Sequence, residues 1–407
     1  AESLPMMLGV GLSGQPFTGT DIGGYSGGAS PELFARWMAL GVISPFMRGH
    51  FTSGVAGQEP WMFGPEVLAI SRAFLQLRVR LLPYLEGLFD AAHVTGAPVL
   101  RPVAWHFPEH PPADDLALLG PWLLAAPVLA EGATDRPLDL PPGRWLDWWS
   151  GRVIQGPARI TPSVRLAALP LFLREGAIVP TGPAARSAAE AAGPLTLELF
   201  PGPTPTRQTR VLDGGGEAVG HIEYVLSPRA DGFSLSAAGD APPAGPLHLR
   251  IRPLDQPPTA VTLDGLPVAD VRHDPQDRSL WLTVPDVAAF TLVITGAAQG
   301  PEPAWVEVPF EVQVPEDTPR DRPVHIASSV DGWQVHHPLA WQADGTAAGT
   351  LRAPRGEWFD YKFSRGDWPT VEKWPDCEEA DNRYGLAAAW PPRAEQVFAW
   401  RDRCEAP

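Results

Sequence analysis

The sequence predicts an α/β region followed by all-β domains. Over residues 1–120, stretches with helical apolar periodicity alternate with short buried-strand patterns, which is the order of a parallel α/β fold. From about residue 121, short apolar runs alternate with turns rich in proline and glycine. The 49 prolines and 40 glycines of this 407-residue chain favour short strands and turns over long helices.

The first elements are a helix end, a strand and a second helix. Residues 2–12 are predicted to end a helix that leads into a short buried strand at Pro16–Thr18. Ser30 and Pro31 provide a helix start signal, and apolar side chains at helical spacing follow over residues 31–41.

A strand, a long helix and a third strand complete this region. Val42–Phe46 is predicted to be the second buried strand. Residues 65–95 have the periodicity of one long helix, which Pro83 should kink and Gly96 should end. Pro98–Val103 is predicted to be the third strand. Such repeats form an α/β barrel, which closes with eight strands, so the sequence accounts for about three of them.

The remainder of the chain has the pattern of β-sandwiches. Trp145, Trp148 and Trp149 are expected to pack in a sandwich core, and a sugar-stacking platform is the alternative. Residues 182–194 are rich in Ala, Gly, Ser and Pro and are predicted to be a linker. Strands of a second sandwich are predicted at Leu195–Phe200, Leu247–Ile251 and Phe290–Ile294.

The composition excludes several classes of partner. A formal net charge of -16 argues against nucleic acid and anionic membranes, and it suits a neutral substrate. No apolar stretch is long enough to cross a bilayer, so a soluble protein is expected, either cytoplasmic or secreted. The two cysteines, Cys377 and Cys404, could pair with each other, but they do not indicate a compartment.

Asp21 is the candidate catalytic residue. It is a single carboxylate in a run of small and apolar residues, where Gly19, Gly23 and Gly24 permit special backbone conformations and close approaches. An acid that follows a strand, in a glycine-lined turn, is how a barrel presents a catalytic group at its C-terminal rim. The alternative is a turn aspartate that caps its own loop.

The segment around Asp21 resembles a known family. The pattern Gly-Leu-Ser-Gly-x-Pro-Phe-x-Gly-x-Asp-Ile-Gly-Gly-Tyr is similar to the acid/base segment of glycoside hydrolase family 31, which contains α-glucosidases and α-xylosidases. The resemblance is strong to about residue 182 and weaker to about residue 298. Further matching segments follow in the family's order: Ser44–His50, Glu59–Trp61, Leu77–Leu85, Pro98–Pro102, Leu118–Gly120, Ala126–Leu129 and Leu171–Pro180.

The resemblance implies a domain order. The three predicted strands are expected to be the last three of a (β/α)8 barrel, followed by two β-sandwich domains and a C-terminal β-sandwich module. The expected bounds are 1–120 for the barrel part, 121–182 for the proximal sandwich, 183–300 for the linker and distal sandwich, and 301–407 for the module.

The resemblance also implies catalytic roles. Asp21 matches the general acid/base, while Arg48 and His50 match positions near the sugar at the scissile bond. The alternatives are a structural ion pair for Arg48 and a satisfied buried histidine for His50. Retaining hydrolysis needs a second carboxyl group about 5–5.5 Å from the first. In the family this nucleophile lies in a Trp-x-Asp-Met-Asn-Glu type segment after the fourth barrel strand, and no such segment occurs in the sequence. We therefore expect the C-terminal half of a family 31 enzyme, inactive alone.

The C-terminal quarter resembles a family 20 starch-binding module. It holds eight of the 16 tryptophans, and flat indole faces can stack on the apolar faces of sugars. The matching segments are Val308–Pro315, Ser329–Gln334, Tyr361–Gly366 and Asp381–Arg383. The resemblance implies that Trp333, Lys362 and Asn382 contact starch, with either Trp368 or Trp374 as the second platform. The alternative for some tryptophans is sandwich core, with Trp341 and Trp358 as the candidates.

Two functions are therefore compatible with the sequence. The first is an α-glucosidase-type hydrolase, or half of a split α-glucosyltransferase, whose barrel is completed by a separate chain. The second is a non-catalytic α-glucan-binding protein. Both predict an α-glucan or maltooligosaccharide ligand and no cofactor or metal, since His106 and His110 are separated by Pro108 and do not form a helical metal pair. Residues 1–120 alone are expected to aggregate or to seek a partner, because uncovered strands expose apolar edges and faces.

Overall fold

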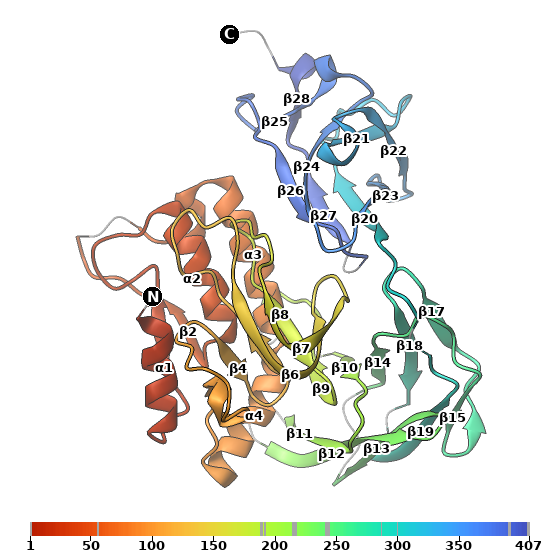
Figure 1. Cartoon of the computed structure of the whole chain (residues 1–407). Helices are drawn as coiled ribbons and strands as arrows, with labels where there is room; N and C mark the ends of the chain where they lie inside the picture. The colour runs from red at the N-terminus through yellow and green to blue at the C-terminus, as the bar shows by residue number, and fades with distance from the viewer. Residues whose placement is uncertain are drawn as a thin grey trace. The chain divides into compact units, whose positions relative to one another are not determined.

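The computed structural model describes residues 2–54, 57–187, 190, 193–213, 218–240, 245–285, 287–298, 300–389 and 392–404 (Figure 1). The chain divides into two compact units. The first comprises residues 1–148 and 153–300, and the second comprises residues 149–152 and 301–407. Within the described ranges, no helix has both the length and the apolar character that a membrane span requires.

The first unit begins with helices around a pair of parallel strands, drawn in red and orange in Figure 1. Strand β1 (Gly19–Ile22) pairs with β2 (Phe46–Gly49), which places their C-terminal ends at one edge. The predicted first two helices are confirmed as α1 (Ser3–Leu12) and α2 (Pro31–Ile43). The Ser30 hydroxyl caps α2 by accepting a hydrogen bond from the Leu33 amide at 3.2 Å.

The strand predicted at Pro16–Thr18 is wrong, because β1 begins only at Gly19. Phe17 is 66% exposed. Its ring lies against those of Phe46 and Phe89, with the ring centroids 5.1 and 5.7 Å away. Gly19 is the residue at which the backbones approach. A Cβ atom at this position would lie 1.9 Å from the Phe46 carbonyl oxygen, so β1 can pair there only because residue 19 has no side chain.

The strand predicted at Val42–Phe46 is wrong except at Phe46. Helix α2 continues to Ile43, and β2 starts at Phe46. The physical reason is Arg78, whose guanidinium donates to the carbonyls of Val42 and Ser44 at 3.0 and 2.5 Å and to that of Pro45 at 2.9 Å. These bonds satisfy the carbonyl groups at the end of α2, which would otherwise lack partners. Val42 therefore stays helical, and its apolar side chain is buried on the helix.

The predicted long helix is two helices. Helix α3 (Pro65–Arg80) ends before Leu81, and α4 (Leu82–Thr95) has Pro83 in its first turn, where a missing N–H is tolerated. Gly96 ends α4 in the left-handed conformation, with a φ of 74°, as predicted.

The third predicted strand does not extend the parallel pair. Strand β3 (Leu100–Arg101) runs antiparallel to β4 (Ala117–Leu119) and begins a six-stranded antiparallel sheet. Two strands therefore pair in parallel where three were expected, and the expected boundary at residue 120 falls inside this sheet. Its order is β3-β4-β5-β8-β6-β7, with β5 at Leu123–Ala125, β6 at Leu138–Asp147, β7 at Val153–Ile160 and β8 at Leu171–Arg174. Trp145 and Trp148 are buried as predicted, and Trp149 is half-buried.

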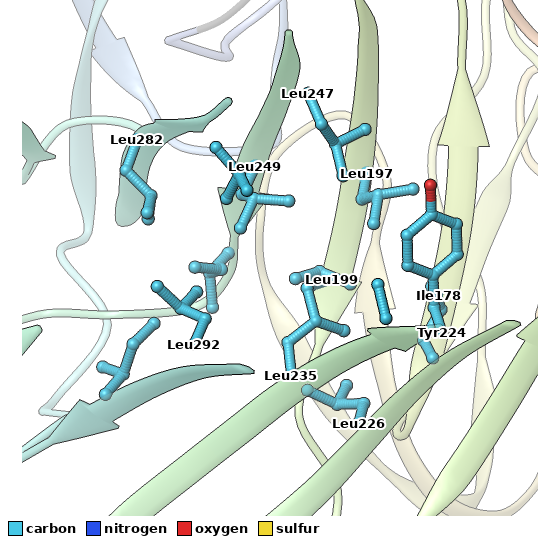
Figure 2. Close-up of a cluster of buried hydrophobic side chains, with 14 of the residues drawn as sticks. Ile178, Leu197, Leu199, Tyr224, Leu226, Leu235, Leu247, Leu249, Leu282 and Leu292 are labelled. Atoms are coloured by element: carbon cyan, nitrogen blue, oxygen red, sulfur yellow. The ribbon is translucent and has the colours of Figure 1, made fainter. Parts of the chain in front are cut away.

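Two further sheets of the first unit enclose an apolar core (Figure 2). Leu197 and Leu249 reach this core from one sheet, and Leu235 and Leu292 from the other. The five-stranded sheet has the order β17-β18-β14-β10-β9: Val271–Asp274, Ser279–Val284, Leu247–Ile251, Leu195–Phe200 and Ala177–Thr181. The six-stranded sheet has the order β11-β12-β13-β19-β15-β16: Thr206–Asp213, Ala218–Arg229, Gly232–Gly239, Ala289–Thr295, Ala260–Leu263 and Leu266–Pro267.

The predicted strands of this sandwich are confirmed as β10, β14 and the central part of β19. Strand β9, which precedes the predicted linker, already belongs to its five-stranded sheet through pairing with β10. Within the predicted linker 182–194, residues 188, 189, 191 and 192 lie outside the described residues.

The second unit is a smaller β-structure with its own core. A seven-stranded sheet has the order β26-β24-β21-β22-β23-β20-β27: Arg383–Leu386, Trp358–Ser364, Val324–Ser328, Val335–Trp341, Ala347–Pro354, Trp305–Gln313 and Arg393–Gln396. Strands β25 (Glu372–Lys373) and β28 (Ala399–Trp400) form a separate pair. Trp341 packs against this core as expected, although it is only half-buried. Trp358 is also half-buried, and Trp400 is fully buried within the core. Cys377 and Cys404 form a disulfide.

Candidate functional site

Asp21 and Arg48 form the centre of the candidate active site. They are register partners across β1 and β2, close to the C-terminal ends of both strands. Arg48 Nε donates to Asp21 Oδ1 at 2.5 Å, and Arg48 Nη2 approaches Oδ2 at 3.4 Å. The Asp21 side chain is 18% exposed and that of Arg48 is 49% exposed. The hydrogen bond to the Asp21 carboxylate raises the pKa of the Arg48 guanidinium.

The turn after Asp21 is built from two glycines in the positive-φ region. Gly23 has a φ of 85° and Gly24 a φ of 87°, as the glycine pattern predicted. Gln58 is buried against this turn and donates to the Gly24 carbonyl at 2.9 Å. A Cβ atom on Gly23 would lie 2.2 Å from Gln58 Oε1, so the turn and the glutamine fit only without a side chain at residue 23. The sequence analysis did not identify Gln58, and no local pattern marks it.

His50 directly follows β2 and is exposed. Its ring stacks on that of Tyr25, with centroids 5.3 Å apart and planes at 27°. Tyr25 is 54% exposed, and its carbonyl accepts a hydrogen bond from the Thr52 amide at 2.8 Å. The alternative of a satisfied buried histidine is therefore excluded for His50, because the residue is exposed. Arg48, by contrast, does form an ion pair, and its partner is the candidate acid itself.

The site offers one carboxylate, that of Asp21, which the Arg48 guanidinium orients. A carboxyl group held at a strand end can exchange a proton with a sugar oxygen or with water. The Asp21 carboxylate is hydrogen-bonded and ion-paired to Arg48. Across the residues that the structure describes, no group of three or more His, Cys, Asp or Glu side chains could hold a metal ion. His106 instead contacts Arg101 Nη1 through Nε2 at 2.9 Å, and His110 contacts backbone carbonyls.

A second candidate site lies in the second unit. Trp333 and Trp368 come together with ring centroids 6.3 Å apart and planes tilted by 48°. Trp368 is 41% exposed and Trp333 is half-buried. Trp374 pairs instead with Phe398, at 6.0 Å between centroids. Of the two alternatives for the second platform, the geometry therefore brings Trp368, and not Trp374, to Trp333.

The polar candidates lie on two segments, Lys362 on β24 and Asn382 after β25. Lys362 Nζ donates to the Ala380 carbonyl at 2.6 Å and lies 3.6 Å from Glu379 Oε1. Asn382, two residues after Ala380, is exposed. The sequence analysis did not identify Glu379, which also pairs with Lys373 and Arg401. Its partners are spread along the chain, so no local motif could have found it.

Comparison with known proteins finds family matches in the first part of the chain. Residues 1–88 match the family model of the glycosyl hydrolases family 31 TIM-barrel domain, and residues 96–179 match the glycosyl hydrolase family 31 C-terminal domain. The first range contains Asp21, Arg48 and His50. The second contains the antiparallel sheet formed by β3 to β8.

Two relatives that the chain matches are named as α-glucosidases. It is 38% identical over 188 residues to α-glucosidase 2 of Bacillus thermoamyloliquefaciens, covering 46% of this chain and 24% of the relative. It is 31% identical over 316 residues to the lysosomal α-glucosidase of Rattus norvegicus, covering 70% of this chain and 33% of the relative. The chain thus spans about a quarter to a third of the length of these two relatives.

Solved structures extend the similarity. A family 31 dextranase from Flavobacterium johnsoniae, complexed with isomaltotriose, superposes with a TM-score of 0.67 at 25% identity, covering 72% of this chain and 41% of that one. The cycloalternan-forming enzyme from Listeria monocytogenes superposes with a TM-score of 0.66, covering 94% of this chain and 40% of that one. At 19% identity, this second match shows a shared fold alone.

Proposed function

We propose that this chain is part of a retaining α-glucosidase-type enzyme that acts on α-glucans or maltooligosaccharides, with Asp21 as its general acid/base. The observation that carries the proposal is the orientation of the Asp21 carboxylate by Arg48 at the C-terminal edge of a parallel strand pair. This is the edge at which barrel enzymes place their catalytic groups. The family 31 match and the names of the α-glucosidase relatives support it.

The proposed chemistry assigns one proton relay to Asp21. In the first step its carboxyl group protonates the glycosidic oxygen as the bond to the leaving sugar breaks. In the second step its carboxylate accepts a proton from the water that releases the bound sugar. Arg48 fixes the orientation of this carboxylate. The exposed His50 imidazole, stacked on Tyr25, is positioned to hydrogen-bond a sugar hydroxyl.

Retaining hydrolysis also requires a second, nucleophilic carboxylate beside Asp21. We propose that a separate chain or segment with the earlier barrel strands supplies it, and that the 407 residues alone do not hydrolyse glycosides. Residues 301–407 are proposed as a starch-binding module, in which Trp333 and Trp368 stack on sugar rings while Lys362 and Asn382 contact hydroxyl groups. The tilted pair of indoles supports this assignment.

A second candidate is a non-catalytic α-glucan-binding protein. The same indole pair favours it, because glucan binding by the second unit does not require Asp21. The two candidates differ in whether the chain can be complemented to an active enzyme.

The deciding experiment is a complementation assay with an aryl α-glucoside. We expect no turnover by the chain alone, and turnover when a polypeptide with the earlier strands of a family 31 barrel is added. Asp21→Asn should abolish this turnover, while retention on granular starch stays unchanged. Turnover by the chain alone would refute the incomplete-site proposal. Turnover that survives Asp21→Asn would refute the role of Asp21, and starch retention without any complementation would favour the binding protein.

A further inference from the structure

A surface loop of the second unit, residues 374–382, is tied to the end of the chain at two points. The first tie is the Cys377–Cys404 disulfide. The second is Glu379, whose carboxylate accepts hydrogen bonds from Arg401 Nη2 at 2.9 and 3.0 Å and also pairs with Lys373. The hydrogen bond from Lys373, with the Arg401 charge nearby, lowers the pKa of Glu379 to about 2. This ionic tie is therefore present at neutral and mildly acidic pH.

The disulfide and the Glu379 ion pair both connect the loop to residues 399–404, which are anchored in the unit. Residues 399–404 include Trp400, which is fully buried and donates through Nε1 to Thr318 Oγ1 at 2.9 Å. The Arg401 amide donates to the Val371 carbonyl at 2.9 Å, and β28 pairs with β25. None of these contacts involves a cysteine. The segment is therefore held by the core of the unit whether or not the disulfide is present.

The 374–382 loop has far less support of its own. Residues 375, 376, 378, 379, 381 and 382 are exposed, and Cys377 adopts a φ of 66°, which is uncommon for a residue with a side chain. Its backbone hydrogen bonds are short-range, from the Cys377 amide to the Trp374 carbonyl and from the Trp374 amide to the Glu378 carbonyl, and an antiparallel bridge pairs Lys373 with Glu379. Elsewhere in the loop, Ala380 is buried, Trp374 packs against Phe398 and Lys362 donates to the Ala380 carbonyl. The exposed part around Cys377 is held to residues 399–404 by the disulfide and by Glu379.

The same loop positions the polar groups proposed to contact glucan. Lys362 Nζ is held by the Ala380 carbonyl at 2.6 Å and lies 3.6 Å from Glu379. Asn382 is carried by the loop itself. A change in the loop therefore moves both polar candidates, whereas the Trp333 and Trp368 pair lies on other segments.

We propose that the Cys377–Cys404 disulfide is a redox switch for glucan binding by the second unit. This proposal rests on the glucan-binding function proposed above. A dithiol supplies the two electrons: the Cys377–Cys404 S–S bond breaks, each sulfur gains one electron and one proton, and the dithiol closes to its own cyclic disulfide. Both cysteines are half-buried and hence within reach of a small reductant, and the chain has no other cysteine with which either could pair wrongly. Reduction releases the loop and leaves the anchored segment in place.

The test uses the full chain with and without dithiothreitol. Affinity for maltoheptaose and retention on granular starch are measured in both states. The tryptophan bands of the near-UV circular dichroism spectrum report the packing of the indoles, the buried Trp400 among them. We expect reduction to weaken maltoheptaose binding by between about threefold and tenfold, with the near-UV signal retained. The Cys377→Ser/Cys404→Ser variant should bind as weakly as the reduced chain and should not respond to dithiothreitol.

A second variant tests the ionic tie without touching the cysteines. Glu379→Gln in the oxidised chain should weaken binding by about twofold, and reduction of this variant should weaken it more than reduction of the unmodified chain, because both ties are then lost. Equal glucan binding in the oxidised and reduced states would overturn the switch alone. Loss of the near-UV signal on reduction would also overturn it, since the core and not the loop would then depend on the disulfide. Failure of the oxidised chain to bind any glucan would overturn the proposed function of the unit and the switch with it.

Discussion

Arg48 Nε donates a 2.5 Å hydrogen bond to Asp21 Oδ1, and the two residues are direct register partners across β1 and β2. The orientation of the candidate acid is therefore set by the pairing of two strands and not by a flexible loop. Side chains on regular elements are held more accurately than side chains on loops, which catalysis requires. Any change that separates β1 from β2 should disturb the candidate site even where neither residue is altered.

Gly19→Ala is expected to separate these strands. The new methyl group would lie 1.9 Å from the Phe46 carbonyl oxygen, a backbone atom that cannot rotate away. We expect a loss of about 2–3 kcal/mol in the free energy of unfolding, and faster amide hydrogen exchange in β1 and β2. Urea unfolding and hydrogen exchange measure both.

Gly9→Ala is the matched control. Gly9 lies within α1, and a Cβ atom there meets nothing within 4 Å. Alanine favours a helix interior over glycine, so we expect a gain of about 0.5–1 kcal/mol. If both variants have the same stability, the close approach at Gly19 does not determine the pairing.

Trp333→Ala and Trp368→Ala should each weaken glucan binding. The two indoles form one tilted pair, so removal of either leaves an incomplete surface for the sugar. We expect a loss of at least about tenfold in maltoheptaose affinity for each variant, which corresponds to about 1.4 kcal/mol. Trp374→Ala should have a smaller effect, because Trp374 pairs with Phe398.

Trp305→Ala provides the control for an exposed tryptophan outside this pair. Trp305 is 45% exposed on β20, and its ring lies 5.4 Å from the Arg352 guanidinium. Glucan affinity should be unchanged in this variant. An effect as large as that of Trp333→Ala would place the binding surface elsewhere on the unit.

The sequence predicted best the elements that depend on local patterns. Strands β10 and β14 were predicted with their observed bounds, because apolar alternation over Leu195–Phe200 and Leu247–Ile251 is the signal that the fold uses. The capping of α2 by Ser30 is equally local. Asp21 was identified as the candidate acid, and the structure adds that its partner is Arg48.

The predictions that are wrong concern residues whose structure is set by contacts distant in the sequence. Val42 and Ile43 have strand propensity, but Arg78 binds the carbonyls that end α2 and keeps both residues helical. The apolar residues of Pro98–Val103 indicate a strand but not its partner. The sequence analysis therefore placed this strand in the parallel barrel part, whereas β3 pairs with β4 in an antiparallel sheet.

The stability of the first unit should depend on pH through His106. Burial, together with the positive charges of Arg101 and Arg174, lowers the pKa of His106 to about 4. In the unfolded chain a histidine has a pKa of about 6.5. Between these values the unfolded chain binds a proton that the folded chain does not, so the free energy of unfolding falls as the pH falls from 6.5 to 4.

We expect this contribution to be about 1–2 kcal/mol, after allowance for solvent screening of a half-buried group. Urea unfolding of the unmodified chain and of His106→Gln at pH 7.5 and at pH 4.5 isolates it, because the other titrating groups are common to both proteins. The unmodified chain should lose more stability between these two pH values than the variant. An identical loss would show that His106 does not titrate differently in the folded state.

Arg250→Met should strongly destabilise the first unit. Arg250 is 1% exposed and donates to Asp277 through Nε at 2.9 Å and Nη2 at 2.5 Å, while its Nη1 approaches Glu198 Oε1 at 3.3 Å. Burial alone would raise the pKa of Asp277, but the Arg250 and Arg252 charges lower it, so this carboxylate is ionised inside the protein. Methionine replaces the volume and not the charge. The variant therefore leaves Asp277 buried without its partner, and breaking a buried pair in this way costs about 3–5 kcal/mol.

Arg207→Met is the matched control, and it decides whether burial or the ion pair itself is responsible. Arg207 pairs with Glu223 at 2.6 Å on the six-stranded sheet of the same unit, but the two side chains are 67% and 43% exposed. Water already solvates both charges, so removal of this pair should change the free energy of unfolding by less than about 1 kcal/mol. Urea unfolding of the two variants should thus give a several-fold difference in the loss of stability. Similar losses would mean that the buried cluster is no more important than a surface pair, and that the apolar core of Figure 2 stabilises the sandwich without it.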